Sequence, residues 1–169
     1  MTASVTAHKK KAPRELRVAI LTVSTTRGLA EDKSGKWMAG QAARNGFRVV
    51  FHDVAPDDAD VIRNEAASII ENYRPHALLV SGGTGVSPKD VTIEALRPVF
   101  EKEMTAFAAI FAQLSYERID SAAILSRAAA GIWKNAVIFC MPGSIKACKL
   151  ACKHIIFPEL GHVAKHLQE

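Results

Sequence analysis

The sequence has no apolar stretch long enough to cross a bilayer, and its first residues lack the apolar core of a secretion signal. Cysteine is scarce, with three residues in 169 (Cys140, Cys148 and Cys152). An odd, small number of cysteines does not support a disulfide framework and is typical of a reducing compartment. These absences argue against a membrane protein and predict a cytoplasmic one.

The standard nucleotide-binding motifs are also missing. A dinucleotide fingerprint needs a third glycine after Gly83 and Gly85, but the position holds Pro88. A mononucleotide P-loop needs Gly-Lys-Ser or Gly-Lys-Thr, and neither occurs in the chain. No Ser/His/Asp or Cys/His constellation can be argued from the sequence either. The chain is therefore not a standard NAD-binding protein or P-loop NTPase.

Positive charge is concentrated at the amino end. The formal net charge is +5, and residues 1–15 carry +3 of it, from Lys9, Lys10, Lys11 and Arg14 against Glu15. Because residues 1–14 lack apolar periodicity, we expect a disordered basic tail there and one globular domain over residues 15–169. Nucleic-acid binding by the tail is an unfavoured alternative, since no basic surface with interleaved aromatic residues accompanies it.

Strand-like and helix-like patterns alternate along the chain. Apolar β-rich runs predict strands at residues 16–24, 47–54, 77–81, 128–132 and 136–141. The last two are joined by a turn at Trp133, Lys134 and Asn135, where Trp133 is expected to be exposed for a subunit contact. Helical spacing predicts helices at 33–45, 59–73, 92–100, 104–117 and 144–155, and a short final helix from Pro158. Successive strand–helix units favour an α/β fold, a three-layer α/β/α sandwich with a mostly parallel central sheet.

The most informative segment follows the third predicted strand, where Gly82, Gly83, Thr84 and Gly85 come directly after an apolar run. Glycines bring the backbone close to a ligand and allow positive φ, so several N–H groups can face one anion. The helix expected from Thr92 adds its free N–H groups and positive dipole end. The segment predicts a phosphorylated ligand. The alternative is a tight turn that binds nothing.

Other polar loops follow the remaining strands and should reach the same edge of the sheet. They contain Ser24 after the first strand, Asp57 after the second, and Pro142, Gly143 and Ser144 after the last. Asp57 and Asp90 are the carboxylates best placed to hold a hard cation. For Asp57, helix capping is the favoured alternative. For Asp90, the functional role is favoured, and the alternative is capping or hydrogen bonding within its own loop.

Two further groups of residues have structural explanations. Cys148 and Cys152 fall on an apolar helical face, which indicates packing rather than metal binding. Glu159, His162 and His166 have spacing compatible with zinc, but they lie on a short terminal helix and solvation is the favoured interpretation.

Five ordered motifs resemble those of the MoaB/Mog family of molybdenum-cofactor biosynthesis proteins. They span about residues 16–160 and read EDKSG (31–35), PDD (56–58), SGGTG with KDVT (81–85 and 89–92), LSRA (125–128) and MPGS (141–144, with Met141 first). The resemblance implies a three-layer α/β fold, a homo-trimer or homo-hexamer, and contacts with other proteins of the same pathway.

The resemblance also implies a reaction, the Mg²⁺- and ATP-dependent adenylylation of the molybdopterin phosphate with release of pyrophosphate. Asp57 and Asp90 would be the catalytic, magnesium-binding acids. The residues implied to bind ATP and molybdopterin are Ser24, Ser34, Gly82, Gly83, Thr84, Gly85, Thr92, Arg127, Pro142, Gly143 and Ser144.

The sequence departs from the family pattern at four places. Thr25 stands where an acidic residue is common, Lys89 replaces Arg, Ile93 replaces Pro, and residues 106–109 read AFAA in place of GFGE. If those glycines let the backbone approach the ligand, the added Cβ atoms would weaken the site. The alternative function is therefore a non-catalytic molybdopterin-binding or scaffold protein of the same family.

Overall fold

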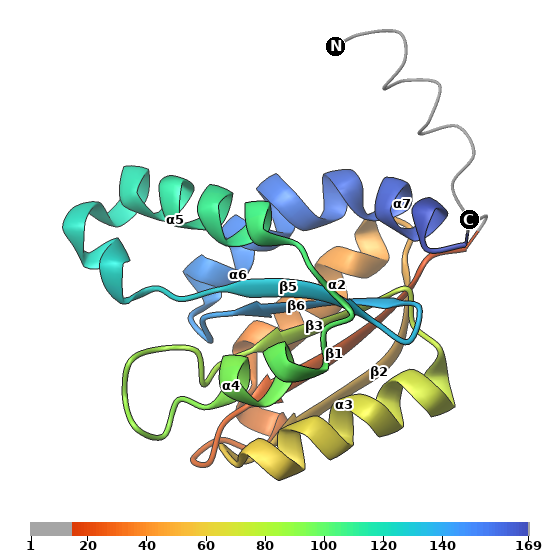
Figure 1. Ribbon diagram of the computed structural model, residues 1–169, viewed down its shortest axis with the longest axis horizontal. Helices are drawn as coiled ribbons and strands as arrows, with labels where there is room; N and C mark the ends of the chain where they lie inside the picture. The colour runs from red at the N-terminus through yellow and green to blue at the C-terminus, as the bar shows by residue number, and fades with distance from the viewer. Residues whose placement is uncertain (1–14, 169) are drawn as a thin grey trace, which may run out of the picture.

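The computed structural model describes residues 15–168, so the tail predicted for residues 1–14 lies outside the described residues. Six strands form one sheet in the order β2-β1-β3-β6-β5-β4 (Figure 1). The strands are β1 (Arg17–Val23), β2 (Arg48–Ala55), β3 (Ala77–Ser81), β4 (Lys102–Glu103), β5 (Ala129–Trp133) and β6 (Ala136–Met141). Strands β2, β1, β3 and β6 are parallel, whereas β5 and β4 run antiparallel to their neighbours.

Helices cover both faces of the sheet. One hydrophobic core joins the sheet to α2 (Lys33–Arg44), α5 (Thr105–Ile119), α6 (Ile145–Ala151) and α7 (Phe157–His166). The opposite core joins it to α3 (Ala59–Tyr73) and α4 (Thr92–Leu96) (Figure 1). The central strands are buried on both sides, as parallel strands between two helical layers must be. The predicted three-layer α/β/α fold is confirmed.

Local signals explain several element ends. The Asp32 side chain accepts the Gly35 N–H and caps α2, and Gly46 follows that helix with φ of +79°. Asp58 accepts two N–H groups at the start of α3. The favoured assignment of Asp57 as the cap of this helix is therefore wrong, because its neighbour takes that position.

Short irregular elements complete the chain. The 3₁₀-helices are η1 (Leu29–Glu31), η2 (Arg97–Val99) and η3 (Asp120–Leu125), and a π-helical segment, η4, covers Cys152–Ile156. The helix predicted for residues 92–100 thus divides into α4 and η2. The final helix predicted from Pro158 is confirmed as α7, although the π-helical segment η4 makes helical structure continuous from Ile145 to His166. Pro158 lies in the first turn of α7. There the wider π-turn that precedes it accommodates a residue without an N–H group.

The hairpin that joins β5 and β6 differs slightly from the prediction. Trp133 pairs with Ala136 inside the ladder, so the turn consists of Lys134 and Asn135, with φ of 48° and 64°. Trp133 is half-buried against the core that contains α3 and α4, and is not the exposed turn residue expected.

Candidate active site

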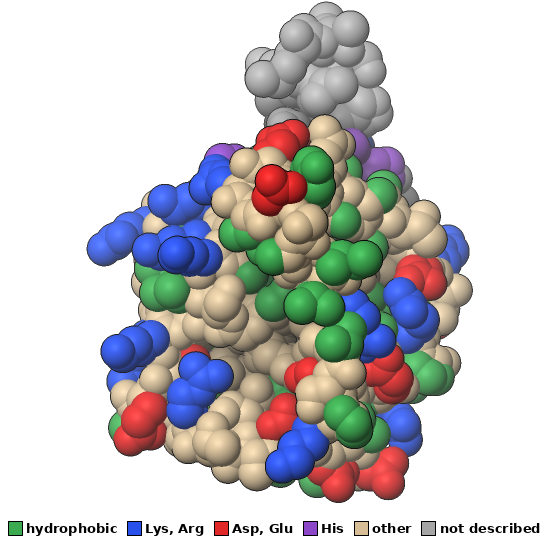
Figure 2. Space-filling model, turned by 90° about the vertical axis from the view of Figure 1, so that its left-hand side faces the viewer, with side chains coloured by type: hydrophobic (Ala, Val, Ile, Leu, Met, Phe, Trp, Pro, Cys, Tyr) green, Lys and Arg blue, Asp and Glu red, His purple; other side chains and the backbone are tan. Residues whose placement is uncertain are grey.

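The carboxyl ends of the parallel strands bring four loops to one edge of the sheet. Thr22 of β1 is in register with Ser81 of β3, which in turn pairs with Met141 of β6. The loops that begin at Ser24, Gly82 and Pro142 therefore start at the same level. Figure 2 looks onto this edge and shows a central hollow, with Lys and Arg side chains gathered at its upper left and acidic side chains mostly below.

The loop after β3 can be built only with glycine at its first two positions. Gly82 and Gly83 have φ of +101° and +60°. A Cβ atom on Gly82 would lie 2.2 Å from the Val23 carbonyl oxygen. On Gly83 it would lie 2.5 Å from Thr92 Oγ1 and 3.1 Å from Asp57 Oδ1. Close packing against both neighbouring loops explains these glycines.

Thr92 fixes the loop to the helix that follows it. Its hydroxyl donates to the Gly82 carbonyl at 2.8 Å, and its N–H donates to the Gly83 carbonyl at 2.9 Å. Thr92 is fully buried, so both hydrogen bonds are shielded from water. Thr92 thus positions the glycine loop; the predicted role in direct ligand binding stays a prediction.

Asp90 closes the far part of the same loop. One carboxylate oxygen, Oδ2, accepts the Ser87 N–H at 2.9 Å. This is the hydrogen bond within its own loop that was considered as the alternative role of Asp90. The residue does not cap α4, whose N-cap is Val91. Its other oxygen, Oδ1, makes no hydrogen bond to a described residue. A Cβ atom on Gly85 would lie 2.8 Å from Asp90 Oδ2, so Gly85 allows this carboxylate to lie against the loop.

Asp57 is held from the neighbouring loop by Thr25. Its Oδ2 accepts both the Thr25 N–H at 2.8 Å and the Thr25 hydroxyl at 2.7 Å. Thr25, one of the positions where the sequence departs from the pattern that the resemblance implies, thus orients a carboxylate. The second oxygen, Oδ1, faces Gly83 and makes no hydrogen bond to a described residue. The glycine loop therefore has one carboxylate beside Gly83 and another beside Gly85.

Arg127 is hydrogen-bonded to the backbone of the glycine loop. Its Nε donates to the Thr84 carbonyl at 3.0 Å, and its NH2 donates to Glu94 at 2.6 Å. Burial alone would raise the pKa of Glu94, but the hydrogen bond and charge of Arg127, with Arg97 nearby, hold this pKa below its usual value. The Thr84 hydroxyl is buried without a hydrogen-bond partner among the described residues.

The turn between β6 and α6 packs directly on the glycine loop. A Cβ atom on Gly143 would lie 3.0 Å from the Gly82 Cα. The Ser34 hydroxyl donates to the Gly143 carbonyl at 2.8 Å, which ties the start of α2 to this turn. Ser144 caps α6 by accepting the Ala147 N–H at 3.2 Å. Ser24, on the neighbouring loop, accepts the Arg27 N–H at 3.2 Å.

A buried polar network beneath the site was not found by the sequence analysis. Asp32 is 3% exposed, and its Oδ2 accepts the Thr22 hydroxyl at 2.7 Å and lies 2.8 Å from His52 Nε2. Burial raises the pKa of Asp32, but hydrogen bonds from His52, the Gly35 N–H and Thr22 outweigh it and leave the pKa below its usual value. A Cβ atom on Gly35 would lie 2.0 Å from the same oxygen, so only glycine fits.

The cysteines considered for metal binding are structural. Cys148 and Cys152 are buried in the core, which confirms the packing interpretation. His162 lies near Glu159 and His166, but residues 15–168 contain no group of three or more His, Cys, Asp or Glu side chains placed to hold a metal. No helix within residues 15–168 is long and apolar enough to span a membrane.

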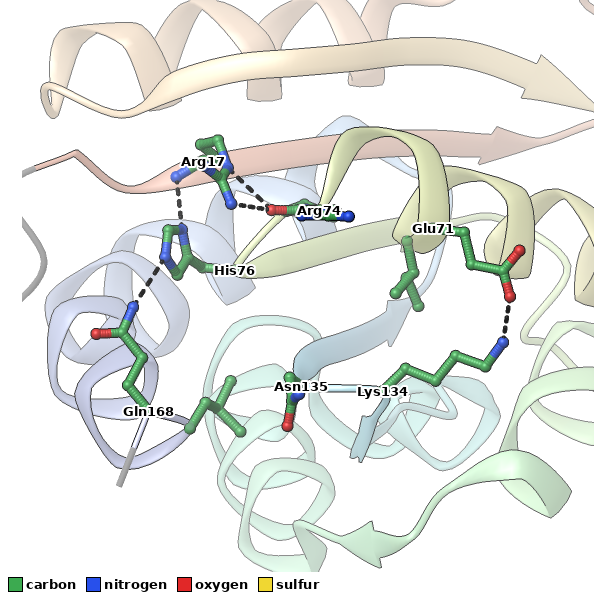
Figure 3. Close-up of a pocket in the computed structure, with 10 residues that line it drawn as sticks. Arg17, Glu71, Arg74, His76, Lys134, Asn135 and Gln168 are labelled. Carbon is green, nitrogen blue, oxygen red and sulfur yellow. Dashed lines mark hydrogen bonds and ion pairs between the residues drawn. The ribbon is translucent and has the colours of Figure 1, made fainter.

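A cavity of about 870 Å³ lies at the opposite, amino ends of the strands (Figure 3). Its polar groups are largely paired with one another. Arg17 donates to the Arg74 carbonyl and, through its N–H, to His76 Nδ1, while Lys134 pairs with Glu71. The cavity is far along the sheet from the glycine loop, and we regard it as separate from the candidate site.

The family model described as "Probable molybdopterin binding domain" matches residues 19–162. The chain belongs to this molybdopterin-binding family. It is 41% identical to molybdenum cofactor biosynthesis protein B of Bacillus subtilis (strain 168) over 167 residues, covering 98% of each chain. It is 37% identical to the "Probable molybdopterin adenylyltransferase" of Methanocaldococcus jannaschii, with 92% of this chain and 96% of the relative aligned.

Solved structures agree with this assignment. A crystal structure of molybdenum cofactor biosynthesis protein B matches with a TM-score of 0.89 and 37% identity, over 94% of this chain and 99% of that one. The tungsten cofactor synthesizing protein MoaB from Pyrococcus furiosus matches with a TM-score of 0.84 and 32% identity, over 94% and 100%. The resemblance to the MoaB/Mog family is therefore confirmed.

Proposed function

We propose that the protein acts in molybdenum cofactor biosynthesis as a molybdopterin adenylyltransferase. The observation that carries the proposal is the glycine loop, which has Asp57 at one side and Asp90 at the other and packs against the β6–α6 turn. The backbone of a glycine loop at the start of a helix suits phosphates, and a pair of carboxylates suits the cation that accompanies a nucleotide triphosphate.

The reaction needs no covalent intermediate on the protein. An oxygen of the molybdopterin phosphate attacks the α-phosphorus of ATP and forms a new P–O–P bond. The bond from the α-phosphorus to the oxygen bridging to the β-phosphate breaks, and pyrophosphate leaves. The protein contributes orientation of the two phosphates and neutralisation of their charge. This agrees with the lack of a nucleophile–base pair in the sequence.

The carboxylates fit a magnesium ion that arrives with ATP. Asp57 and Asp90 each use Oδ2 for a hydrogen bond within the loops and keep Oδ1 available. Mg²⁺ is commonly bound by one or two carboxylates, with substrate phosphates and water as the remaining ligands. When bound, the ion would supply charge neutralisation at the triphosphate.

The second candidate function is non-catalytic molybdopterin binding, and it depends on the AFAA sequence of residues 106–109. Phe107 is buried and packs against Phe111 and Phe139, whereas Ala106 and Ala109 are exposed. The altered positions are in the first turns of α5, and Phe107 is there a core residue. Because Ala106 and Ala109 are exposed, their substitution leaves the core of α5 intact, and we favour the enzyme.

Release of pyrophosphate tests the proposal. The measurement uses Mg²⁺ and ATP, with and without molybdopterin, for wild type, Asp90→Asn and the control Asp53→Asn, which changes an exposed aspartate on β2. We expect molybdopterin-dependent release by wild type and Asp53→Asn, and loss of release in a folded Asp90→Asn variant. Release at the wild-type rate by Asp90→Asn would refute its role. Binding of molybdopterin by a wild type that releases nothing would favour the second candidate.

We also propose that the protein forms a homo-oligomer. Apolar side chains are exposed near the end of α5 and on η3, namely Tyr116, Ile119, Ile124 and Leu125, and we call this set the α5–η3 surface. Ile124 is 84% exposed. Exposed apolar residues of this size gathered on neighbouring elements are typical of protein contacts. A second copy of the chain is the partner that the family resemblance favours.

A further inference from the structure

The cavity at the amino ends of the strands is formed by segments that are far apart in the sequence. It has a volume of about 870 Å³ and lies between the end of α3, the turn of the β5–β6 hairpin and the end of α7 (Figure 3). Small-molecule sites in proteins commonly have volumes of about 300–1,000 Å³. We call it the amino-end cavity. It lies at the opposite ends of the strands from the glycine loop, so it is no part of the candidate active site.

The lining of the amino-end cavity carries an excess of positive charge. Three cationic side chains line it, those of Arg17, Arg74 and Lys134. Glu71 is the one carboxylate among the lining residues, and it is paired with Lys134. Within residues 15–168, neither arginine has an ion pair with a carboxylate. The unpaired charge of two guanidinium groups matches a phosphate monoester, which carries about −1.5 to −2 at pH 7.

The floor of the cavity provides a hydrogen-bond donor. The backbone N–H of Arg17 donates to His76 Nδ1 at 3.0 Å, so the neutral ring carries its proton on Nε2. Burial, together with the charge of Arg17, lowers the pKa of His76, and the ring is therefore neutral at pH 7. Its Nε2 lies 3.5 Å from the side-chain amide of Gln168, at the outer limit of a hydrogen bond. The Nε2–H group can thus donate to a bound anion.

Three lining residues have backbone conformations that their side chains do not favour. Arg74, Lys134 and Asn135 have φ of 45°, 48° and 64°. Among the non-glycine residues of positive φ within residues 15–168, only Asp120 lies outside the cavity lining. Glycine would relieve the strain at Arg74 and Lys134. Strained residues cluster at ligand sites, where the gain in binding offsets the strain. A use for these two cationic side chains in binding explains why they occupy such positions.

The rest of the lining includes an apolar surface. Ile70 is 4% exposed, Pro75 is buried and Leu167 is half-buried. An organic group can pack on these side chains while an attached phosphate reaches the guanidinium groups. The cavity therefore suits an organic phosphate better than inorganic phosphate alone.

We propose that the amino-end cavity binds an organic phosphate monoester, with its phosphate at the cationic side chains and its organic part on the apolar lining. Arg74 makes no hydrogen bond to a described residue through its guanidinium group, so all of its donors are available. Arg17 uses Nε and NH2 for the Arg74 carbonyl and can add NH1. No step of the adenylylation is assigned to this cavity, and the site is additional to the proposed function.

Binding of phenyl phosphate tests the proposal, because this monoester has an apolar ring and no nucleoside. Calorimetric titration at pH 7 without Mg²⁺ compares it with phenol, which lacks the phosphate, and with inorganic phosphate, which lacks the ring. We expect wild type to bind phenyl phosphate at least about fivefold more tightly than either of the other two compounds. In the NMR spectrum, phenyl phosphate should shift the imidazole signals of His76.

A pair of double variants locates the binding. Arg74→Gln/Lys134→Gln removes two charges from exposed side chains of the cavity and should bind phenyl phosphate at least about tenfold more weakly. Arg44→Gln/Lys102→Gln removes the same charge from exposed side chains that do not line the cavity, and it should match wild type.

Equal affinity of wild type and the cavity variant for phenyl phosphate would overturn the proposal, as would an equal loss in the control variant. Binding that leaves the His76 signals unshifted would place the ligand elsewhere and would also reject the cavity. Inorganic phosphate that binds as tightly as phenyl phosphate would refute the role of the apolar lining. None of these measurements depends on pyrophosphate release, so failure of the proposed function would leave their outcome unchanged.

Discussion

Asp32 connects three elements beneath the candidate site. It joins β1 through Thr22, β2 through His52, and the start of α2 through the Gly35 N–H. The same first turn of α2 carries Ser34, which donates to the Gly143 carbonyl. A change at Asp32 should therefore affect both stability and the position of the β6–α6 turn.

The pH dependence of stability should identify Asp32. Because its pKa is lower in the folded than in the unfolded protein, the carboxylate stabilises the fold at pH values above its unfolded pKa of about 4, and this contribution is lost as pH falls through the folded pKa. Asp32→Asn should lower the free energy of unfolding at pH 5 by roughly 1–3 kcal/mol. Urea unfolding at pH 5, 4 and 3 should show the gap between wild type and variant narrowing. A gap that is as wide at pH 3 as at pH 5 would contradict the lowered pKa.

The roles of residues that depend only on local backbone conformation were predicted well from the sequence. Gly82, Gly83 and Ser144 take conformations or capping positions that short motifs specify. The pairing of Asp32 with His52 could not be predicted, because it depends on the register of β2 against β1 and on the irregularity between Val18 and Ala19. Asp57 and Asp90 were found, but whether they bind a cation remains a prediction.

Helix α3 ends with an unusual choice of residue. Its C-cap, Arg74, has φ of 45° and ψ of 53°, a left-handed conformation that glycine usually takes at helix ends. Arg17 donates to the carbonyl oxygen of Arg74, a contact that does not involve the Arg74 side chain (Figure 3). The strain of this helix end can therefore be removed without breaking the contact.

Arg74→Gly should raise the free energy of unfolding by about 1 kcal/mol, because glycine tolerates the left-handed conformation. Arg74→Ala removes the same side chain and keeps the strain, so it should bring no comparable gain. Urea unfolding of the three proteins at pH 7 measures the difference. Equal stabilisation by alanine and glycine would show that the side chain, and not the backbone, was responsible.

Elements with strong end signals were predicted within a few residues, and short ones were missed. Helices α2 and α3 have capping residues and apolar periodicity, and the structure places them almost where the sequence did. Strand β4 has two residues, both exposed, which is too short for any alternating pattern. The turn at Lys134 and Asn135 lacks the glycine that marks most two-residue hairpins, so its boundary was set one residue early.

At the scale of the whole molecule, we predict that copies of the chain associate through the α5–η3 surface. We expect wild type to be a trimer or hexamer in sedimentation equilibrium. Ile124→Glu should shift it toward the monomer, since a charge would be buried in the contact. Val61→Glu, on α3 in the opposite helical layer, should leave the oligomer unchanged. A monomeric wild type, or an unaltered oligomer in Ile124→Glu, would contradict the prediction.

The three cysteines have a consequence for a protein that handles a sulfur-rich substrate. All are buried, and burial raises the pKa of Cys140 and of Cys148 to about 12, and raises that of Cys152 well above its usual value. Since thiolates are the species that attack sulfur, the folded protein offers no reactive sulfur to the dithiolene of molybdopterin. The substrate would then be able to enter and leave without forming a mixed disulfide, so that oxidation would not trap it on the protein.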